Sequence, residues 1–273
     1  MRKSSLQKIY EKFKKKQLIE TSVQEYKPKI AFFTGAGISR ESGLSTFRDS
    51  GGLWEKHRIE DVATASAIRK NFELVNNFYN QRRIEVRNTL PNKAHLIVKE
   101  LEEIFDVFVV TQNVDDLHEK AGTASIIHLH GEIMKSRSMA NTNLIYDQQE
   151  DIKVGDKCII TNSQLRPHII LFNERLNEED YYKARRHIRE ADILVVIGTS
   201  LEVEPAASLV TEALGEKEFY IIDPDDVELK YKSNYIHIQK TATEGLFELK
   251  SILIEQAKLL KNKFEEEKNK ISY

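Results

Sequence analysis

The sequence predicts an α/β fold, in which buried parallel strands alternate with helices. Short runs of β-branched and aromatic residues at 30–33, 107–111 and 193–197 are typical of buried strands. Each run ends in glycine or in polar residues, and helical patterns separate the runs. With 273 residues, the chain is long enough for one large α/β domain or for a large domain with a smaller insert.

The composition excludes several classes of protein. The 41 basic and 43 acidic residues nearly balance, so we expect neither nucleic acid nor a membrane as the main partner. Cys158 is the single cysteine. This excludes an internal disulfide framework and a four-cysteine zinc site, and it favours a reducing, cytoplasmic setting. The longest apolar runs are too short to cross a bilayer. None of these features predicts the oligomeric state.

A lysine-rich segment precedes the first strand, and a glycine turn follows it. Residues 5–20 carry apolar side chains at helical spacing, which predicts an amphipathic helix that packs on the main body rather than on a membrane. Gly35 and Gly37 predict a turn whose backbone N–H groups face a diphosphate. Arg40 stands where the dinucleotide-binding pattern has its third glycine, so a plain glycine-rich turn is an equal alternative.

Polar residues follow the next two strands. Residues 112–115 come directly after a buried strand, where open parallel sheets bind ligands, although an Asn/Asp helix cap is the alternative. His128 and His130 fall on the same side of a regular strand. Only a local break near Gly131 would therefore let one face the core and the other a cleft.

The remaining segments are predicted as helices, loops and an insert. The loop 41–54 carries Phe47 and Trp54 and is open to interpretation as a lid or as an ordinary surface loop. Residues 132–165 lack periodicity and indicate an inserted subdomain. Helical patterns cover residues 58–87, 94–105, 178–190 and 242–263, strands are expected at 166–174 and 219–223, and residues 264–273 are expected to fray.

In their order along the chain, these motifs resemble the sirtuin family of NAD-dependent protein deacylases, from about residue 29 to about residue 255. The motifs that carry the resemblance are Gly35-Ala-Gly-Ile-Ser39, Glu41-Ser-Gly43, Thr46-Phe-Arg-Asp49, Thr111-Gln-Asn-Val-Asp115 with Leu117-His118 and Ala121-Gly122, His128-Leu-His-Gly131, and Gly198-Thr-Ser200 with Val203 and Pro205-Ala-Ala207.

The resemblance implies a Rossmann-like parallel sheet with helices on both faces plus a smaller domain formed by two inserts. An acyl-lysine protein substrate would enter the cleft between the two domains. The implied divisions are an N-terminal helical extension (1–28), a Rossmann-like NAD-binding domain (29–57, 92–131 and 166–260), a small domain made of a helical insert (58–91) and a zinc-less insert (132–165), and a frayed C-terminal tail (261–273).

The resemblance also implies NAD as the cofactor. His130 matches the general base, and Asn113 and Asp115 complete the implied catalytic set. In the implied reaction the acyl oxygen attacks the nicotinamide ribose, and a neutral histidine near pH 7 takes a proton from a ribose hydroxyl, giving nicotinamide and O-acyl-ADP-ribose. The implied NAD contacts are Gly35, Ala36, Gly37, Phe47, Arg48, Asp49, Gln112, Asn113, Asp115, Gly198, Thr199, Ser200, Asp223 and Ala242.

A second set of residues bears on the acyl group. Ala63, Tyr79 and Arg82 match positions that form an open pocket and a Tyr/Arg pair in the sirtuin subgroup that favours negatively charged acyl groups. Tyr79 and Arg82 are three apart on a predicted helix, so they share a face, and arginine pairs well with a carboxylate such as that of succinyl or malonyl. A solvated arginine is the alternative. The implied substrate strand contains Ile170, Phe172, Asn173 and Glu174.

The sequence departs from the family pattern at three points. Most sirtuins hold a structural zinc through two cysteine pairs, and we expect no metal here because neither His128 nor His168 completes a four-ligand set with Cys158. Asn173 replaces a usual glycine, and asparagine tolerates a positive φ. Asp223 replaces a usual asparagine near the adenosine ribose, where an acid favours NAD over NADP.

These departures leave two other functions open. An NAD hydrolase or ADP-ribosyltransferase on the same fold would need no acyl-lysine, and the missing zinc cysteines together with Asn173 keep this alternative open. A non-enzymatic sensor of NAD or ADP-ribose is the third hypothesis. The presence of His130, Asn113 and Asp115 argues against the sensor.

Overall fold

The computed structural model describes residues 26–46, 58–213, 217–227, 229 and 234–271. The predicted N-terminal helix at 5–20 lies outside the described residues. So do Phe47, Arg48, Asp49 and Trp54 of the predicted loop.

The large body is built on a six-stranded parallel sheet with the order β3-β2-β1-β7-β8-β9. The prediction of an α/β fold with a parallel sheet is therefore confirmed. The strands are β1 (Lys29–Thr34), β2 (Asp106–Thr111), β3 (Ile126–His128), β7 (Ile193–Ile197), β8 (Glu218–Ile222) and β9 (Ile236–Ile238).

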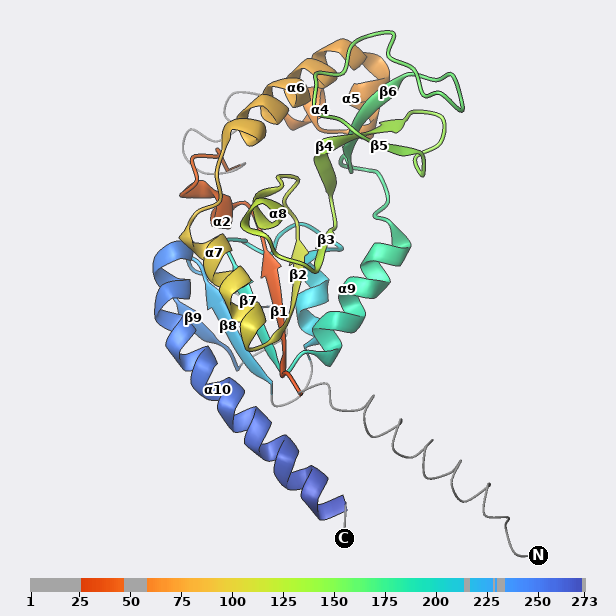
Figure 1. The fold of residues 1–273 in the computed structure, drawn as a ribbon. Coiled ribbons are helices and arrows are strands. Elements are labelled where there is room, and N and C mark those ends of the chain that lie inside the picture. Colours follow the sequence, from red (N-terminus) through yellow and green to blue (C-terminus); the bar gives the residue numbers. More distant parts are fainter. Residues whose placement is uncertain (1–25, 47–57, 214–216, 228, 230–233, 272–273) are drawn as a thin grey trace, which may run out of the picture.

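Helices cover both faces of this sheet (Figure 1). Phe32 and its strand neighbours pack against α7 and α10 on one face. Phe33, the next residue, points to the other face and packs with residues of α9 and η2, as the two-residue period of a strand requires. The helices of this body are α2 (Gly37–Arg40), α7 (Lys93–Glu100), η1 (Leu101–Glu103), α8 (Leu117–Ala121), α9 (Glu178–Glu190), η2 (Ala207–Glu212) and α10 (Ala242–Ile271).

A second, smaller unit lies beyond the carboxyl ends of the large sheet (Figure 1). Its antiparallel sheet has the order β5-β4-β6 and packs against three helices through a separate apolar cluster that includes Val75, Ile133 and Ile169. Its elements are α4 (Ile59–Val62), α5 (Ala65–Lys70), α6 (Phe72–Asn88), β4 (Gly131–Ser138), β5 (Ile145–Asp147) and β6 (Leu165–Ile169).

The strand predicted at 166–174 belongs to this smaller sheet. We assigned residues from 166 onward to the large domain, but β6 pairs antiparallel with β4. The boundary prediction was wrong here because apolar content alone does not reveal which sheet a strand joins. The other domain limits stay predictions.

The helical pattern predicted at 58–87 is broken into three helices. Thr64 and Asn71 interrupt it, and their side chains accept hydrogen bonds from Ala67 N and Leu74 N at the starts of α5 and α6. Such N-caps contribute about 1 kcal/mol each, enough to restart a helix in a new direction.

The prediction that the C-terminal tail frays was also wrong, since α10 continues to Ile271. Phe264 of this helix stacks on Tyr26 with the ring centroids 4.0 Å apart. A tertiary contact therefore supports a segment whose composition alone suggested fraying. Within the described part of the chain, we find no helix with both the length and the apolar character needed to cross a bilayer.

Candidate active site

The carboxyl ends of four parallel strands meet at one edge of the large sheet. The register pairs Thr34 of β1 with Thr111 of β2 and with Ile197 of β7, and Thr111 with His128 of β3. The segments that follow these strands therefore lie side by side, facing the smaller unit (Figure 1). All the polar segments singled out from the sequence on β1, β2, β3 and β7 come together here.

The glycine turn after β1 packs directly on the turn after β7. Gly35 N and Gly37 N donate to Ile197 O at 3.0 Å and Gly198 O at 2.9 Å. A Cβ atom on Gly37 would lie 2.5 Å from Gly198 Cα, so a side chain is excluded by the neighbouring backbone. Because Ile197 O and Gly198 O accept these two N–H groups, neither is left for a diphosphate. That another N–H group of this turn faces a diphosphate stays a prediction.

The Ala36 N–H between these glycines has no hydrogen-bond partner among the described residues. It is thus the donor of this turn that remains for a ligand. Gln112 offers a second one, because its side-chain Nε2 is buried and unpartnered within the described chain. An orphaned buried donor at a strand end fits a polar ligand such as NAD, and both residues belong to the predicted NAD set.

Two predicted catalytic residues are held in a buried polar network with Ser39. Ser39 Oγ donates to Asp115 Oδ2 at 2.9 Å. Asn113 Nδ2 donates to Gly35 O at 3.1 Å and to Ser39 Oγ at 3.2 Å. Burial raises the pKa of Asp115 above its usual value, although bonds from Leu117 N and Ser39 oppose this. No signal in the sequence indicates this role of Ser39, which the glycine motif includes only as a residue of the following helix.

His130 lies in the two-residue connection between β3 and β4. Its Nδ1 is 3.0 Å from Gln112 O, and since a carbonyl only accepts, Nδ1 carries the proton in the neutral ring. Nε2 is then the basic nitrogen. Gly131 has a φ of 82°, and this left-handed residue provides the predicted local break. Burial lowers the pKa of His130 below its usual value, so the ring stays neutral around pH 7, as a general base requires.

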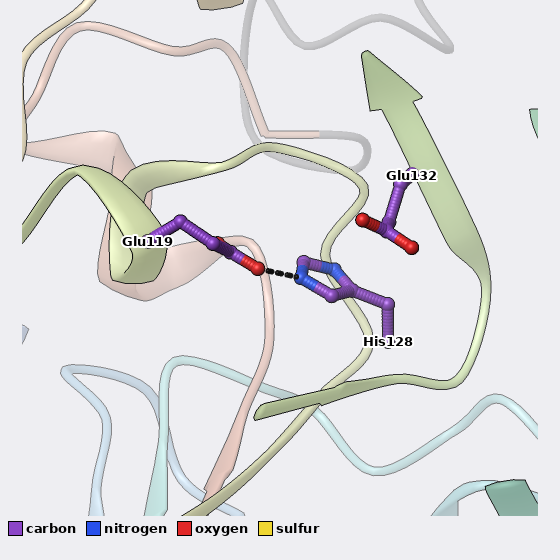
Figure 2. A group of neighbouring side chains, drawn as sticks. All are labelled: Glu119, His128 and Glu132. Carbon is purple, nitrogen blue, oxygen red and sulfur yellow. Dashed lines mark hydrogen bonds and ion pairs between the residues drawn. The ribbon is translucent and has the colours of Figure 1, made fainter. Parts of the chain in front are cut away.

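His128 lies between two carboxylates and is bonded to one of them, that of Glu119 (Figure 2). Its Nε2 is 2.7 Å from Glu119 Oε1, and Glu132 lies on its other side. The ligand atoms of Glu119, His128 and Glu132 lie within 4.8 Å of one another. Lys135 Nζ, however, contacts both carboxylate oxygens of Glu132, at 2.9 and 2.8 Å, and so already supplies a cation to this cluster.

The predicted substrate segment is anchored on the smaller unit. Phe172 N donates to Ala63 O and Phe172 O accepts from Ala65 N, both at 2.9 Å. Asn173 has a φ of 67°, which confirms that asparagine takes the positive φ expected there. Ile170 N donates to His130 O at 2.8 Å, which ties this segment to the base.

The carboxylate of Glu174 is bound by neighbouring protein groups. Its side chain binds Arg137 at 2.7 Å and Arg166 at 2.5 Å, both buried arginines that face each other on β4 and β6. Leu171 N also donates to it at 2.9 Å. The Glu174 side chain therefore fixes the turn that presents Asn173, and its place in the predicted substrate strand stays a prediction.

The predicted acyl-pocket residues lie close together on the smaller unit. Ala63 and Tyr79 are buried in its apolar cluster. Burial raises the pKa of Tyr79, so its hydroxyl remains a hydrogen-bond donor. Arg82, three residues on, forms an ion pair with Glu85 on the same helix, while its Nε is buried and has no partner in the described residues.

The remaining predicted NAD contacts lie around β7 and β8. Gly198 has a φ of 62°, Thr199 is buried and Ser200 is exposed. Asp223 Oδ1 accepts from Asp225 N at 3.0 Å. Ala242 is buried at the start of α10. These assignments stay predictions, as do those of Phe47, Arg48 and Asp49 outside the described residues.

The residues around Cys158 do not fit a four-ligand zinc site. The buried thiol lies 3.1 Å from the Tyr146 hydroxyl and 3.4 Å from Thr161 N. Among the described residues, the one cluster of three or more metal-ligand side chains is that of Glu119, His128 and Glu132, and it does not include Cys158.

Together the parallel sheet, the glycine turn, the buried Asp115 and the neutral His130 indicate a nucleotide-binding α/β enzyme with its site at the carboxyl edge of the sheet. A model of the Sir2 family matches residues 35–205. An NAD-dependent protein deacylase of Bacteroides thetaiotaomicron is 46% identical over 82% of this chain and 97% of its own length. One from Helicobacter pylori strain J99 is 43% identical over 84% of this chain and 96% of its own.

Solved structures of Sir2 homologues also resemble this chain. The crystal structure of a Sir2 homologue in complex with NAD has a TM-score of 0.75 and 35% identity, covering 89% of this chain and 94% of that one. The chain belongs to the Sir2 family, the sirtuins. The family resemblance of the motifs is thereby confirmed.

We expect the two histidines of the His128-Leu-His130 motif to titrate on opposite sides of pH 6.5. Burial lowers the pKa of His130 from its usual 6.5. Burial also lowers the pKa of His128, but the hydrogen bond to Glu119 outweighs this and raises the pKa of His128 above 6.5. His130 therefore loses its neutral, basic form only at the lower pH. An NMR titration of the two ring Cε1–H signals checks this, and a midpoint for His130 above that of His128 would contradict it.

Proposed function

We infer that this chain is an NAD-dependent protein-lysine deacylase, and we propose that it removes succinyl and malonyl groups as well as acetyl groups. The observation that carries the inference is His130, whose Nδ1 is bound to Gln112 O beside the glycine turn, leaving Nε2 as a base. Membership of a family whose relatives are named NAD-dependent protein deacylases supports the activity. A cytoplasmic location remains a prediction from the single cysteine.

The residues of this chain hold and deprotonate the reactants. Bound NAD supplies a ribose carbon from which nicotinamide leaves when the acyl oxygen attacks. Ala36 N–H and the Gln112 amide offer donors to the cofactor. His130 Nε2 would take the proton of a ribose hydroxyl, whose oxygen would then attack the acyl carbon. The bond from that carbon to the lysine nitrogen would break so that the lysine amine leaves, and water would complete the release of O-acyl-ADP-ribose. Asp115, Asn113 and Ser39 keep the segment after β2 in place through their mutual bonds.

Loss of the His130 side chain should abolish most of the deacylation activity without abolishing NAD binding. In His130→Ala we expect at least a 100-fold loss of peptide deacylation, the usual range for a general base, with NAD binding retained. The assay follows nicotinamide and O-acyl-ADP-ribose with NAD alone, with acetyl-lysine peptide and with succinyl-lysine peptide.

His187→Ala is the matched control, since His187 stacks on Phe108 in the large body and is not part of the site. Near-normal turnover in His130→Ala would reject the assignment of the base. Nicotinamide release without peptide would favour the NAD hydrolase or transferase, and binding without any release would favour the sensor.

The preference for acidic acyl groups is proposed from Tyr79 and Arg82. The ion pair of Arg82 with Glu85 lies within one helix, with Glu85 42% exposed. Such a pair contributes about 1 kcal/mol or less, so a desolvated acyl carboxylate competes well for the guanidinium. The protonated Tyr79 hydroxyl adds a second donor on the same helix face.

Arg82→Met should selectively impair the removal of acidic acyl groups. A hydrogen bond to a charged group contributes about 1.5–3 kcal/mol, so the succinyl/acetyl ratio of kcat/KM should fall at least about tenfold. Arg87→Met on the same helix, where Arg87 binds Gln149 O, is the control and should leave the ratio unchanged. An unchanged ratio in Arg82→Met as well would count against the acyl pocket.

We further propose that the smaller unit is stable without zinc because α6 binds the insert directly. Asn80 Nδ2 donates to Ile152 O at 2.9 Å, and Asn80 Oδ1 accepts from Ile152 N at 3.1 Å. Asn76 donates to the same carbonyl at 2.5 Å, and Arg83 Nε donates to Ile133 O at 3.0 Å. These bonds are buried and connect the insert to a helix, as a structural metal would.

Asn80→Ala should therefore destabilise the protein, whereas a chelator should not. The Asn80 side chain makes three buried hydrogen bonds, since its Oδ1 also accepts from Arg83 Nη1 at 2.6 Å, and removing them costs about 2 kcal/mol or more. Asn143→Ala, at an exposed position, serves as the control. Thermal melts with and without EDTA, together with metal analysis, provide the measurement. One equivalent of bound zinc, or a lower Tm in EDTA, would refute the proposal.

A further inference from the structure

His128 is buried at the end of β3, and both of its ring nitrogens are hydrogen-bonded. Figure 2 shows the bond to Glu119. Its side chain is 7% exposed. Nδ1 lies 2.9 Å from the backbone oxygen of Asn113, and Nε2 lies 2.7 Å from Glu119 Oε1. Nδ1 of the imidazole thus contacts the loop after β2, and Nε2 contacts helix α8.

Both partners of the His128 ring are acceptors. A carbonyl oxygen accepts, so Nδ1 donates to Asn113, and an ionised carboxylate accepts, so Nε2 donates to Glu119. The ring is then an imidazolium, and both bonds are charge-assisted, the stronger kind of hydrogen bond. The carboxylate of Glu119 fixes which nitrogen points at the Asn113 carbonyl.

The bonded carbonyl belongs to the segment that carries the predicted catalytic residues. Gln112 O accepts from His130 Nδ1, and the next carbonyl, Asn113 O, accepts from His128 Nδ1. Two imidazoles from one short stretch therefore bind two successive carbonyls. The Asn113 side chain is bonded in turn to Ser39 Oγ.

We propose that the Glu119–His128 pair is a positioning device for the segment Gln112–Asp115: it fixes the Asn113 peptide and thereby aims the Asn113 and Asp115 side chains at NAD. The proposal rests on the deacylase function inferred above. Neither residue touches the reacting atoms, since the pair acts through the Asn113 backbone.

A different reading of the same cluster, a divalent metal held by Glu119, His128 and Glu132, is less well supported. Lys135 binds both oxygens of Glu132, and Nε2 of His128 is already used by Glu119. The two interpretations differ in the role of Glu132. A metal site requires the Glu132 carboxylate, whereas the positioning pair does not.

The test compares Glu119→Ala with Glu119→Gln. In Glu119→Gln the side-chain amide donates to Nε2 of a neutral His128, so Nδ1–H still points at Asn113 O and function is rescued. In Glu119→Ala nothing fixes the ring. We expect Glu119→Ala to weaken NAD binding and lower kcat/KM for NAD about tenfold, and Glu119→Gln to change either less than about threefold. KM for the acyl peptide should stay unchanged in both variants.

Two further variants make the test specific. His128→Ala should match Glu119→Ala, and the double variant should be no worse than either, as expected for residues that act as a unit. Glu132→Gln is the matched control and should retain the wild-type affinity for NAD. Titration calorimetry with NAD measures the effect without turnover, and thermal melts verify that each variant is folded.

Several results would overturn the proposal. These are wild-type NAD affinity in Glu119→Ala, equal impairment of Glu119→Gln and Glu119→Ala, or a loss in Glu132→Gln as large as that in Glu119→Ala, which would favour a metal. A wild-type protein that binds NAD but deacylates no peptide would refute the proposed function alone, because the calorimetric comparison still decides the role of the pair.

Discussion

The close packing of two backbone turns, one after β1 and one after β7, is the constraint on which the site depends. Gly37 and Gly198 approach so closely that a Cβ on either would lie within 2.6 Å of the other turn. Glycine alone permits this approach. The N–H groups of Gly35 and Gly37 donate to β7 and to the turn after it. The sheet itself therefore fixes the position of the Ala36 N–H group. A ligand there meets a preformed donor rather than a mobile loop.

The buried acid follows from this packing. Once the turn is fixed, Ser39 on the short helix after it reaches both Asp115 and Asn113, which come from the next strand end. Burial raises the pKa of Asp115, so the network pays a desolvation cost that its hydrogen bonds only partly offset. Fully bonded buried networks are rigid, and rigidity is what a site that must orient a ribose requires.

Local patterns were sufficient to predict the parallel strands other than β9 and the helix at 178–190, because each depends on side-chain period. The features that were missed depend on distant partners. The N–H groups of Gly35 and Gly37 bond to a strand about 160 residues later. Glu174 binds arginines that meet only through the β4–β6 register. Likewise, Thr64 and Asn71 were not read as helix starts because a continuous apolar pattern runs through them.

His130, the predicted base, lies between the two sheets. It lies in the connection between β3 of the large sheet and β4 of the small one. Its ring is bonded to Gln112 O on the predicted NAD side, while its own carbonyl accepts from Ile170 N on the predicted peptide side. Gly131 makes this arrangement possible, since a Cβ there would lie 2.1 Å from His168 O. The predicted base is therefore held by both units at once, and any relative movement of the two sheets would act directly on its orientation.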